Sequence, residues 1–267
     1  MAASTSLATL ALMGSLALPG AAMADTTKKA GAPESNQLTI RERVQTLHLY
    51  GERGGRVAVV TSGDGGWVHL GPAVAQYLTA QGFFVVGFDA KAYPASFTSG
   101  SATLSTADVS RDYATLLDYA ARGARGRPLL VGISVGAGLS VLAANDKGVQ
   151  SRVAGVIALG LPERNELGWR FRDATIYVTK KTPNEPLFSA RQVAGGVAPV
   201  PLAIFRSTHD EFVTTAESDA IWAETREPHR LWTIAAADHR FSDNQAELQS
   251  RLREAIEWIA LARADSR

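Results

Sequence analysis

The chain has 267 residues, of which 46% are hydrophobic and 20% are charged, so it contains enough apolar residues for one domain with a full core. Its formal net charge is +1, and Lys and Arg are scattered among Asp and Glu, which argues against a nucleic-acid-binding surface. There is no Cys, which excludes disulfides, thiolate metal sites and a Cys nucleophile. We expect no metal, no other cofactor and no nucleic-acid partner.

The first 24 residues have the pattern of an export signal. Leu7–Leu18 is mostly apolar but too short to span a membrane, and Ala22-Met23-Ala24 supplies the small residues that a signal peptidase requires. No Lys or Arg precedes the apolar stretch, and an uncleaved anchor or a disordered tail is the alternative. We predict cleavage after Ala24, a periplasmic protein, a polar linker over residues 25–36 and a single domain over residues 37–267.

Beyond the linker, predicted strands and helices alternate. Short apolar runs predict buried strands over Arg56–Thr61, Phe83–Phe88, Arg127–Val131, Val153–Leu159, Pro201–Phe205 and Leu231–Ala235. Helical spacing and composition predict helices over Leu70–Ala80, Leu104–Ala121, Ala137–Ala144, Thr215–Glu224 and Gln245–Leu261. This alternation predicts an α/β fold with a mostly parallel sheet, helices on both faces and a ligand site beyond the carboxyl ends of the strands.

Three chemically reactive residues follow three of these strands. The pentapeptide from Gly132 to Gly136 reads Gly-Ile-Ser-Val-Gly between a predicted strand and a predicted helix, which is typical of a nucleophile elbow with Ser134 at its tip. Asp210 and His239 follow two later strands, so Ser, acid and His occur in the order of an α/β-hydrolase. We predict that His239 removes the proton of Ser134 and that Asp210 orients the imidazole.

Other residues could take these roles. Glu211 or Asp238 could serve as the acid and His209 as the base, and Asp210 could instead cap the helix that follows it.

The loop after the first strong strand reads Thr-Ser-Gly-Asp-Gly-Gly-Trp over residues 61–67. In an α/β-hydrolase this loop supplies one amide of the oxyanion hole and the residue after the nucleophile supplies the other, so we predict the amides of Asp64 and Val135. A phosphate-binding loop is disfavoured because no Gly-Lys-Ser/Thr sequence follows.

The run Ser62–Trp67, the run Val85–Asp89 and the Ser134 elbow resemble the bacterial VirJ/AcvB family of exported α/β-hydrolase-like proteins. The chain departs from the family pattern at Ala90–Tyr93, where the family usually has Ser-Leu-Arg-Tyr, and around the elbow, which in the family commonly reads Gly-Tyr-Ser-Phe-Gly-Ala-Asp. The resemblance implies hydrolysis of the aminoacyl ester of aminoacylated phosphatidylglycerol, above all lysyl-phosphatidylglycerol, at the outer face of the inner membrane.

The sequence also contains candidate substrate contacts. The carboxylates of Asp64 and Glu211 would attract a cationic aminoacyl head group. Residues 163–199 lie between two predicted core strands, and this segment could face lipid because it mixes aromatic with basic residues: Trp169, Phe171, Phe188, Arg170, Arg172, Lys180 and Lys181. The alternatives to lipid hydrolysis are a periplasmic esterase for soluble substrates and a non-catalytic binding or assembly factor on a hydrolase fold.

Overall fold

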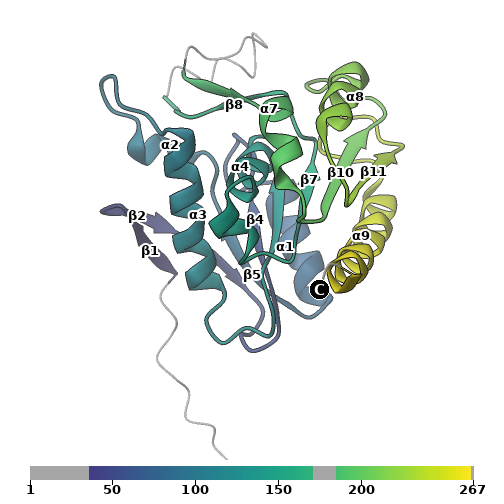
Figure 1. Ribbon diagram of the computed structural model, residues 1–267, viewed down its shortest axis with the longest axis horizontal. Helices are drawn as coiled ribbons and strands as arrows, with labels where there is room; N and C mark the ends of the chain where they lie inside the picture. Colours follow the sequence, from purple (N-terminus) through teal and green to yellow (C-terminus); the bar gives the residue numbers. More distant parts are fainter. Residues whose placement is uncertain (1–35, 171–184, 266–267) are drawn as a thin grey trace, which may run out of the picture. The chain divides into compact units, whose positions relative to one another are not determined.

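A computed structural model of the protein describes residues 36–170 and 185–265. A seven-stranded sheet with the strand order β11-β10-β7-β6-β4-β5-β3 forms its centre (Figure 1). Its strands are β3 (His48–Tyr50), β4 (Arg56–Thr61), β5 (Phe83–Phe88), β6 (Leu129–Ile133), β7 (Gly155–Leu159), β10 (Leu202–Ser207) and β11 (His229–Ile234). All neighbours pair in parallel except β3, which runs antiparallel to β5.

Helices cover both faces of this sheet. The helices α1 (Leu70–Ala80) and α9 (Gln245–Asp265) lie on one face (Figure 1). The helices α3 (Thr106–Ala120), α4 (Val135–Ala144) and α7 (Ala190–Ala194) lie on the other, and the buried side chains of the two groups belong to two separate apolar clusters. Shorter elements complete this part of the chain: α2 (Ala92–Phe97), α5 (Lys147–Gln150), the 3-10 turn η2 (Gly195–Val197) and α8 (Thr215–Glu224). The predicted α/β class, with a mostly parallel sheet between two helical layers, is confirmed.

The central strands form where the sequence is continuously apolar. Every residue of β5, β6 and β7 is buried, as expected for parallel strands that are covered on both faces. The predicted bounds of β4, β5, α1 and α8 agree with the structure. The elbow strand instead runs on to Ile133 and α4 begins at Val135, so a single residue, Ser134, separates the strand from the helix.

A hairpin that the sequence analysis did not predict precedes the sheet. It consists of β1 (Gln37–Ile40) and β2 (Arg43–Thr46), joined by Arg41 and Glu42 at φ values of 43° and 67°. Asn and Gly are the usual residues of such a two-residue turn because they adopt this conformation at low cost. Tertiary contacts therefore stabilise the turn.

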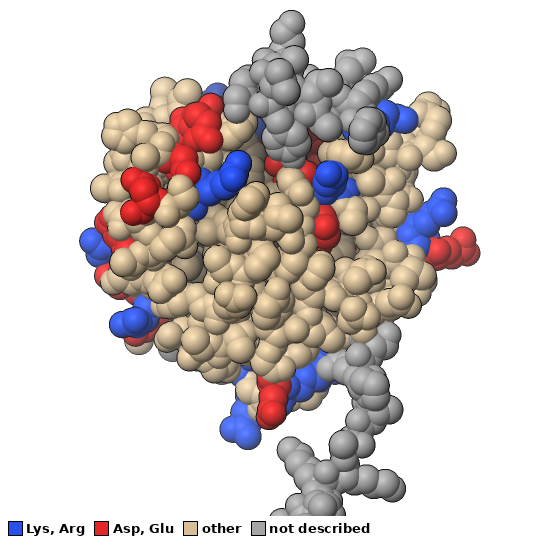
Figure 2. Space-filling model, turned by 180° about the vertical axis from the view of Figure 1, so that it is seen from behind, with Lys and Arg blue, Asp and Glu red and all other residues tan. Residues whose placement is uncertain are grey.

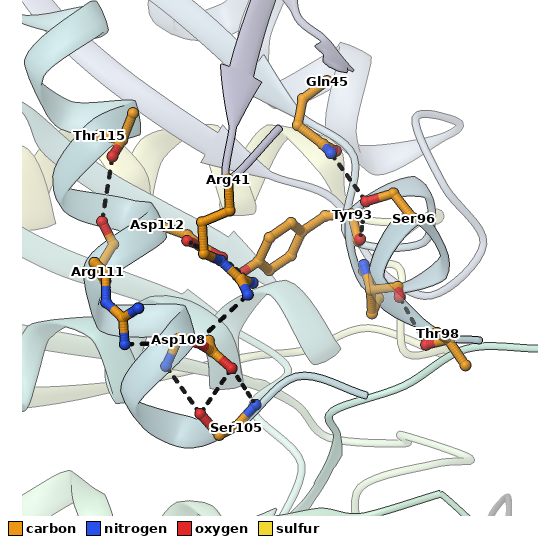
Figure 3. Close-up of polar contacts among 11 residues, drawn as sticks. Arg41, Gln45, Tyr93, Ser96, Thr98, Ser105, Asp108, Arg111, Asp112 and Thr115 are labelled. Carbon is orange, nitrogen blue, oxygen red and sulfur yellow. Dashed lines mark hydrogen bonds and ion pairs between the residues drawn. The ribbon is translucent and has the colours of Figure 1, made fainter. Parts of the chain in front are cut away.

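The contacts that stabilise the turn come from α3. Arg41 donates from Nε and Nη2 to the two oxygens of Asp112, at 2.8 and 2.7 Å (Figure 3). The hydroxyl of Tyr93 donates to the same carboxylate at 2.6 Å. Burial, and then the neighbouring negative charge of Asp112, raise the pKa of Tyr93 well above its usual value, which keeps the phenol protonated as the donor.

We predict that Arg41→Ala destabilises the protein. The Asp112 side chain is only 1% exposed and would lose its bidentate partner, while the guanidinium is 30% exposed. The expected loss of unfolding free energy is about 2–3 kcal/mol, below the range for a fully buried ion pair. Urea unfolding measures it, with Arg43→Ala on the exposed side of β2 as the control. Equal midpoints for the two variants would contradict the assignment.

A second hairpin extends from the body after β7. Its strands β8 (Arg164–Glu166) and β9 (Leu187–Ser189) are antiparallel and flank residues 171–184. Within the predicted lipid-facing segment, Phe188 is buried in the core, and Arg170 pairs with the buried carboxylate of Glu185. Four of the residues named for that segment lie outside the described residues: Phe171, Arg172, Lys180 and Lys181. The predicted export signal and residues 25–35 of the linker also lie outside them.

Candidate active site

Ser134 occupies a strained turn between β6 and α4. Its backbone has φ 53° and ψ −123°, a conformation that is costly for a residue with a side chain. A Cβ atom at Gly132 would lie 2.2 Å from the carbonyl oxygen of Gly136, and one at Gly136 would lie 2.2 Å from that of Ser62. Both glycines of the motif are therefore required by packing, as expected of a nucleophile elbow.

Asp210 and His239 form a close pair. Asp210 Oδ2 lies 2.6 Å from Nδ1 of His239, and the carboxylate side chain is 2% exposed. Its other oxygen accepts the backbone amides of Phe212 and Val213, each at 2.8 Å. The side chain of Thr214, and not that of Asp210, caps α8. These contacts aim the carboxylate at the imidazole.

The second imidazole nitrogen of His239 accepts or donates no hydrogen bond within the described residues. His239 Nε2 is buried and has no hydrogen-bond partner within the described residues. His239 and Ser134 line the same cavity, and the ring of Phe212 lies edge-on to the imidazole with 5.4 Å between centroids. With Nδ1 bonded to a carboxylate, Nε2 is the atom that accepts a proton in a serine hydrolase.

The structure places the competing residues differently. The exposed His209 bonds through Nδ1 to Thr208, at 3.0 Å. Asp238 bonds to Ser242 and to the amide of Arg240; partial burial acts to raise its pKa, but these bonds hold it below the ordinary value.

The carboxylate of Glu211 accepts the backbone amide of His239 at 2.8 Å. Glu211 does not line the cavity, although the sequence suggested it as a substrate contact. Its position fits a residue that orients His239.

The two predicted oxyanion residues lie beside Ser134. Asp64 and Val135 both line its cavity, and a Cβ atom at Gly63 would lie 3.5 Å from that of Ser134. Val135 is the first residue of α4, so its amide has no acceptor within the helix. The arrangement leaves this amide available for an oxygen that becomes negatively charged at the site.

The rest of the loop is anchored to the strands behind it. Asp89 accepts the amide of Trp67 at 3.1 Å, and the indole covers Gly87, where a Cβ atom would approach it to 2.3 Å. The indole also stacks on His48 at 4.7 Å. Burial lowers the pKa of His48, against the opposing effect of Asp89, which favours a neutral ring in this stack. These contacts of Trp67 hold the predicted oxyanion loop, residues 61–67, in position.

The cavity has a volume of about 660 Å³ and a mixed lining. Its charged side chains are Asp64, Glu166, Glu217, Lys91, Arg164 and Arg240. Two large apolar residues of its wall, Val68 and Phe212, are 48% and 39% exposed. Of these residues the sequence analysis proposed only Asp64. Lys91 could have been suggested by its position after a strand, and Arg240 by its position next to the candidate base His239. The polar three-residue strand β8 carries no such local signal.

We predict that Gly160→Ala strongly reduces turnover. A Cβ atom there would lie 2.6 Å from Cε1 of His239 and would displace the imidazole. A shift of about 1 Å lowers kcat by roughly 100-fold. Gly100→Ala is the matched control, because Gly100 has φ +56° against +59° for Gly160 and nothing within 4 Å. Steady-state kinetics compares them, and a similar loss in both variants would show backbone strain rather than displacement of His239.

Comparison with known proteins shows which family and which fold the chain resembles. Residues 55–172 match the model of the family described as "Bacterial virulence protein (VirJ)". The predicted resemblance to this family is confirmed over these residues. No curated protein sequence matches the chain.

Over more than the segment that matches this family, the chain resembles solved α/β-hydrolase structures. Est1E from Butyrivibrio proteoclasticus superposes with a TM-score of 0.61 at 13% identity, covering 84% of this chain and 97% of its own. The Pyrococcus furiosus esterase Pf2001 gives 0.61 at 14%, covering 83% and 88%. The α/β hydrolase GrgF from Penicillium sp. sh18 gives 0.60 at 14%, covering 84% and 98%. The chain therefore has the α/β-hydrolase fold.

Two further properties concern the part of the chain that the structure describes. In residues 36–170 and 185–265, no helix has the length and apolar character needed to cross a bilayer. The same residues contain no cluster of three or more His, Asp or Glu arranged to hold a metal ion.

Figure 2 shows acidic and basic side chains around the margin of one face, whose centre is largely uncharged.

Proposed function

We propose that this protein is a serine esterase with Ser134, His239 and Asp210 as its catalytic residues. His239 Nε2 takes the proton of Ser134 as Oγ attacks the ester carbonyl carbon, and Asp210 stabilises the imidazolium that forms. The amides of Asp64 and Val135 stabilise the negative carbonyl oxygen of the tetrahedral intermediate. The ester C–O bond then breaks, and the leaving alcohol takes the proton back from His239.

A water molecule completes the cycle. His239 removes a proton from this water, which attacks the acyl-serine; the acid is released and Ser134 regains its proton. All four proton transfers pass through the imidazole of His239, so these steps balance without a metal or redox group.

One observation carries the proposal: the Asp210–His239 pair at 2.6 Å leaves Nε2 buried and unpartnered within the described residues, in the cavity that Ser134 lines. An unpaired buried nitrogen is costly unless it has a role. The strained backbone of Ser134 supports the same role, because such strain concentrates at active sites.

For the substrate we propose the aminoacyl ester of aminoacylated phosphatidylglycerol, with lysyl-phosphatidylglycerol foremost. The match of residues 55–172 to the VirJ family supports this choice. The cavity wall also combines carboxylates, which suit a cationic aminoacyl group, with the exposed apolar side chains of Val68 and Phe212, which suit a lipid. Asp64 and Glu166 are the carboxylates best placed for this role, in preference to Glu211.

We further propose that hydrolysis takes place in the periplasm, at the outer face of the inner membrane. The apolar stretch Leu7–Leu18 and the Ala22-Met23-Ala24 site support export. N-terminal sequencing of protein recovered from the periplasm is expected to begin at Asp25. An intact Met1 on cytoplasmic protein would contradict export.

Incubation of the purified protein with total membrane lipids tests the substrate. We expect aminoacylated phosphatidylglycerol to disappear while phosphatidylglycerol and free amino acid appear in equal amounts, with Ser134→Ala inactive. Hydrolysis of soluble esters alone would indicate a soluble-substrate esterase. Binding of the lipid without turnover by the wild type would indicate a non-catalytic factor.

A further inference from the structure

Three positively charged side chains line the cavity of Ser134 from separate parts of the chain. Lys91 lies at the start of α2, Arg164 lies on β8, and Arg240 directly follows His239. The proposed reaction uses none of them. Within the described residues, none of the three takes part in an ion pair. Their charges are therefore available to a ligand.

The fold holds these side chains at the cavity. The ammonium of Lys91 lies 4.7 Å from the ring centre of Trp169, whose amide bonds to Thr98 at 3.1 Å. On β8, the alternate residues Arg164 and Glu166 line the cavity. Asn165 between them is fully buried against Gly138 of α4. Because side chains alternate along a strand, the burial of Asn165 on one face of β8 directs Arg164 and Glu166 to the opposite face, toward the cavity.

The same cavity also contains carboxylates. Glu217 accepts the amide of Glu163 at 2.7 Å. Asp64 and Glu166 line the same cavity. One cavity thus offers negative groups for a cationic acyl part and positive groups for an anion.

We propose that Lys91, Arg164 and Arg240 form a phosphodiester-binding subsite beside the nucleophile. The assignment rests on the proposed function, because in aminoacylated phosphatidylglycerol one glycerol unit separates the cleaved ester oxygen from the phosphodiester. A phosphate close to Ser134 is then a necessary feature of the bound substrate. Lys and Arg are the side chains that bind phosphate through charge-assisted hydrogen bonds.

Two substrates that differ in the phosphodiester test the subsite. One is short-chain lysyl-phosphatidylglycerol used as a monomer, and the other is the lysyl ester of glycerol, which has no phosphate. The variants are Lys91→Gln, Arg164→Gln and Arg240→Gln, with Lys147→Gln on the exposed surface of α5 as the matched loss of one charge. We expect each cavity variant to lose about tenfold in kcat/KM on the phosphodiester substrate, mainly through KM, and much less on the other.

Several outcomes would overturn the subsite. Equal losses on the two esters would make the cations structural, and no loss on either would remove them from the site. The same variants are also assayed on lysyl-phosphatidylglycerol in vesicles that contain anionic lipid. If they lose kcat/KM only in this assay, and not on the monomeric substrate, the cations bind the membrane surface and not the phosphate of the substrate.

A binding measurement separates this subsite from the proposed reaction. Short-chain phosphatidylglycerol, without an aminoacyl group, is titrated into Ser134→Ala. We expect saturable binding that Lys91→Gln, Arg164→Gln and Arg240→Gln each weaken, and absence of binding would overturn the subsite. If phosphatidylglycerol binds but the wild type hydrolyses neither ester, the proposed function fails while the subsite remains.

Discussion

Ser134→Ala is expected to lower kcat for ester hydrolysis by roughly 10⁵- to 10⁶-fold, to the residual rate supplied by binding and the oxyanion amides. The substitution removes the attacking oxygen but retains a Cβ atom at φ 53°, so the elbow should fold. Initial rates on lysyl-phosphatidylglycerol measure the loss, and a fluorophosphonate probe should label the wild type only.

Ser151→Ala provides the control, because Ser151 is exposed and lies outside the cavity. It should retain the wild-type rate and the wild-type labelling. Probe labelling of another serine in Ser134→Ala would remove the nucleophile assignment.

Asp210→Asn is expected to reduce kcat by about 10⁴-fold. The amide nitrogen of Asn would present a donor where the carboxylate now accepts from Nδ1, which favours the tautomer that carries its proton on Nε2 and cannot act as the base. The exchange preserves size, so circular dichroism should match the wild type. Because the three residues act together, Asp210→Asn should add little to the loss in Ser134→Ala.

The neighbouring acids separate this prediction from its rivals. Asp238→Asn should stay within about threefold of the wild-type rate, since Asp238 bonds to Ser242 and to loop amides. Glu211→Gln keeps an oxygen that can accept the His239 amide and should have a modest effect. If Asp210→Asn is nearly as active as the wild type while Asp238→Asn or Glu211→Gln is inactive, the acid of the triad is that other residue and not Asp210.

The sequence predicts the central sheet well because its strands are buried on both faces. A continuous apolar run such as Phe83–Phe88 is typical of such a strand. Ser134, Asp210 and His239 each follow a predicted strand, and the carboxyl ends of parallel strands meet at one edge of the sheet. The separate roles of Asp210, Glu211 and Asp238 could not be predicted, since all three are acids in loops next to a candidate base. Only the orientation of each carboxylate distinguishes them.

Elements stabilised by distant residues could not be predicted either. The turn at Arg41 and Glu42 has the wrong residues for a tight hairpin, and it depends on Asp112, 71 positions along the chain. The β8 strand is only Arg-Asn-Glu, with no apolar alternation to mark it, yet it brings Arg164 and Glu166 to the cavity. Local propensity fails at these positions because tertiary contacts outweigh it.

The acyl-enzyme tests the central claim most directly. The wild-type protein is mixed with lysyl-phosphatidylglycerol, quenched in acid during turnover, digested and analysed by mass spectrometry. We predict that the peptide containing Ser134 gains the mass of one lysyl group, that hydroxylamine removes it, and that Ser134→Ala shows no such peptide. Turnover of the lipid with no acylated peptide in the wild type, or with the lysyl group on a different residue, would contradict the proposed mechanism.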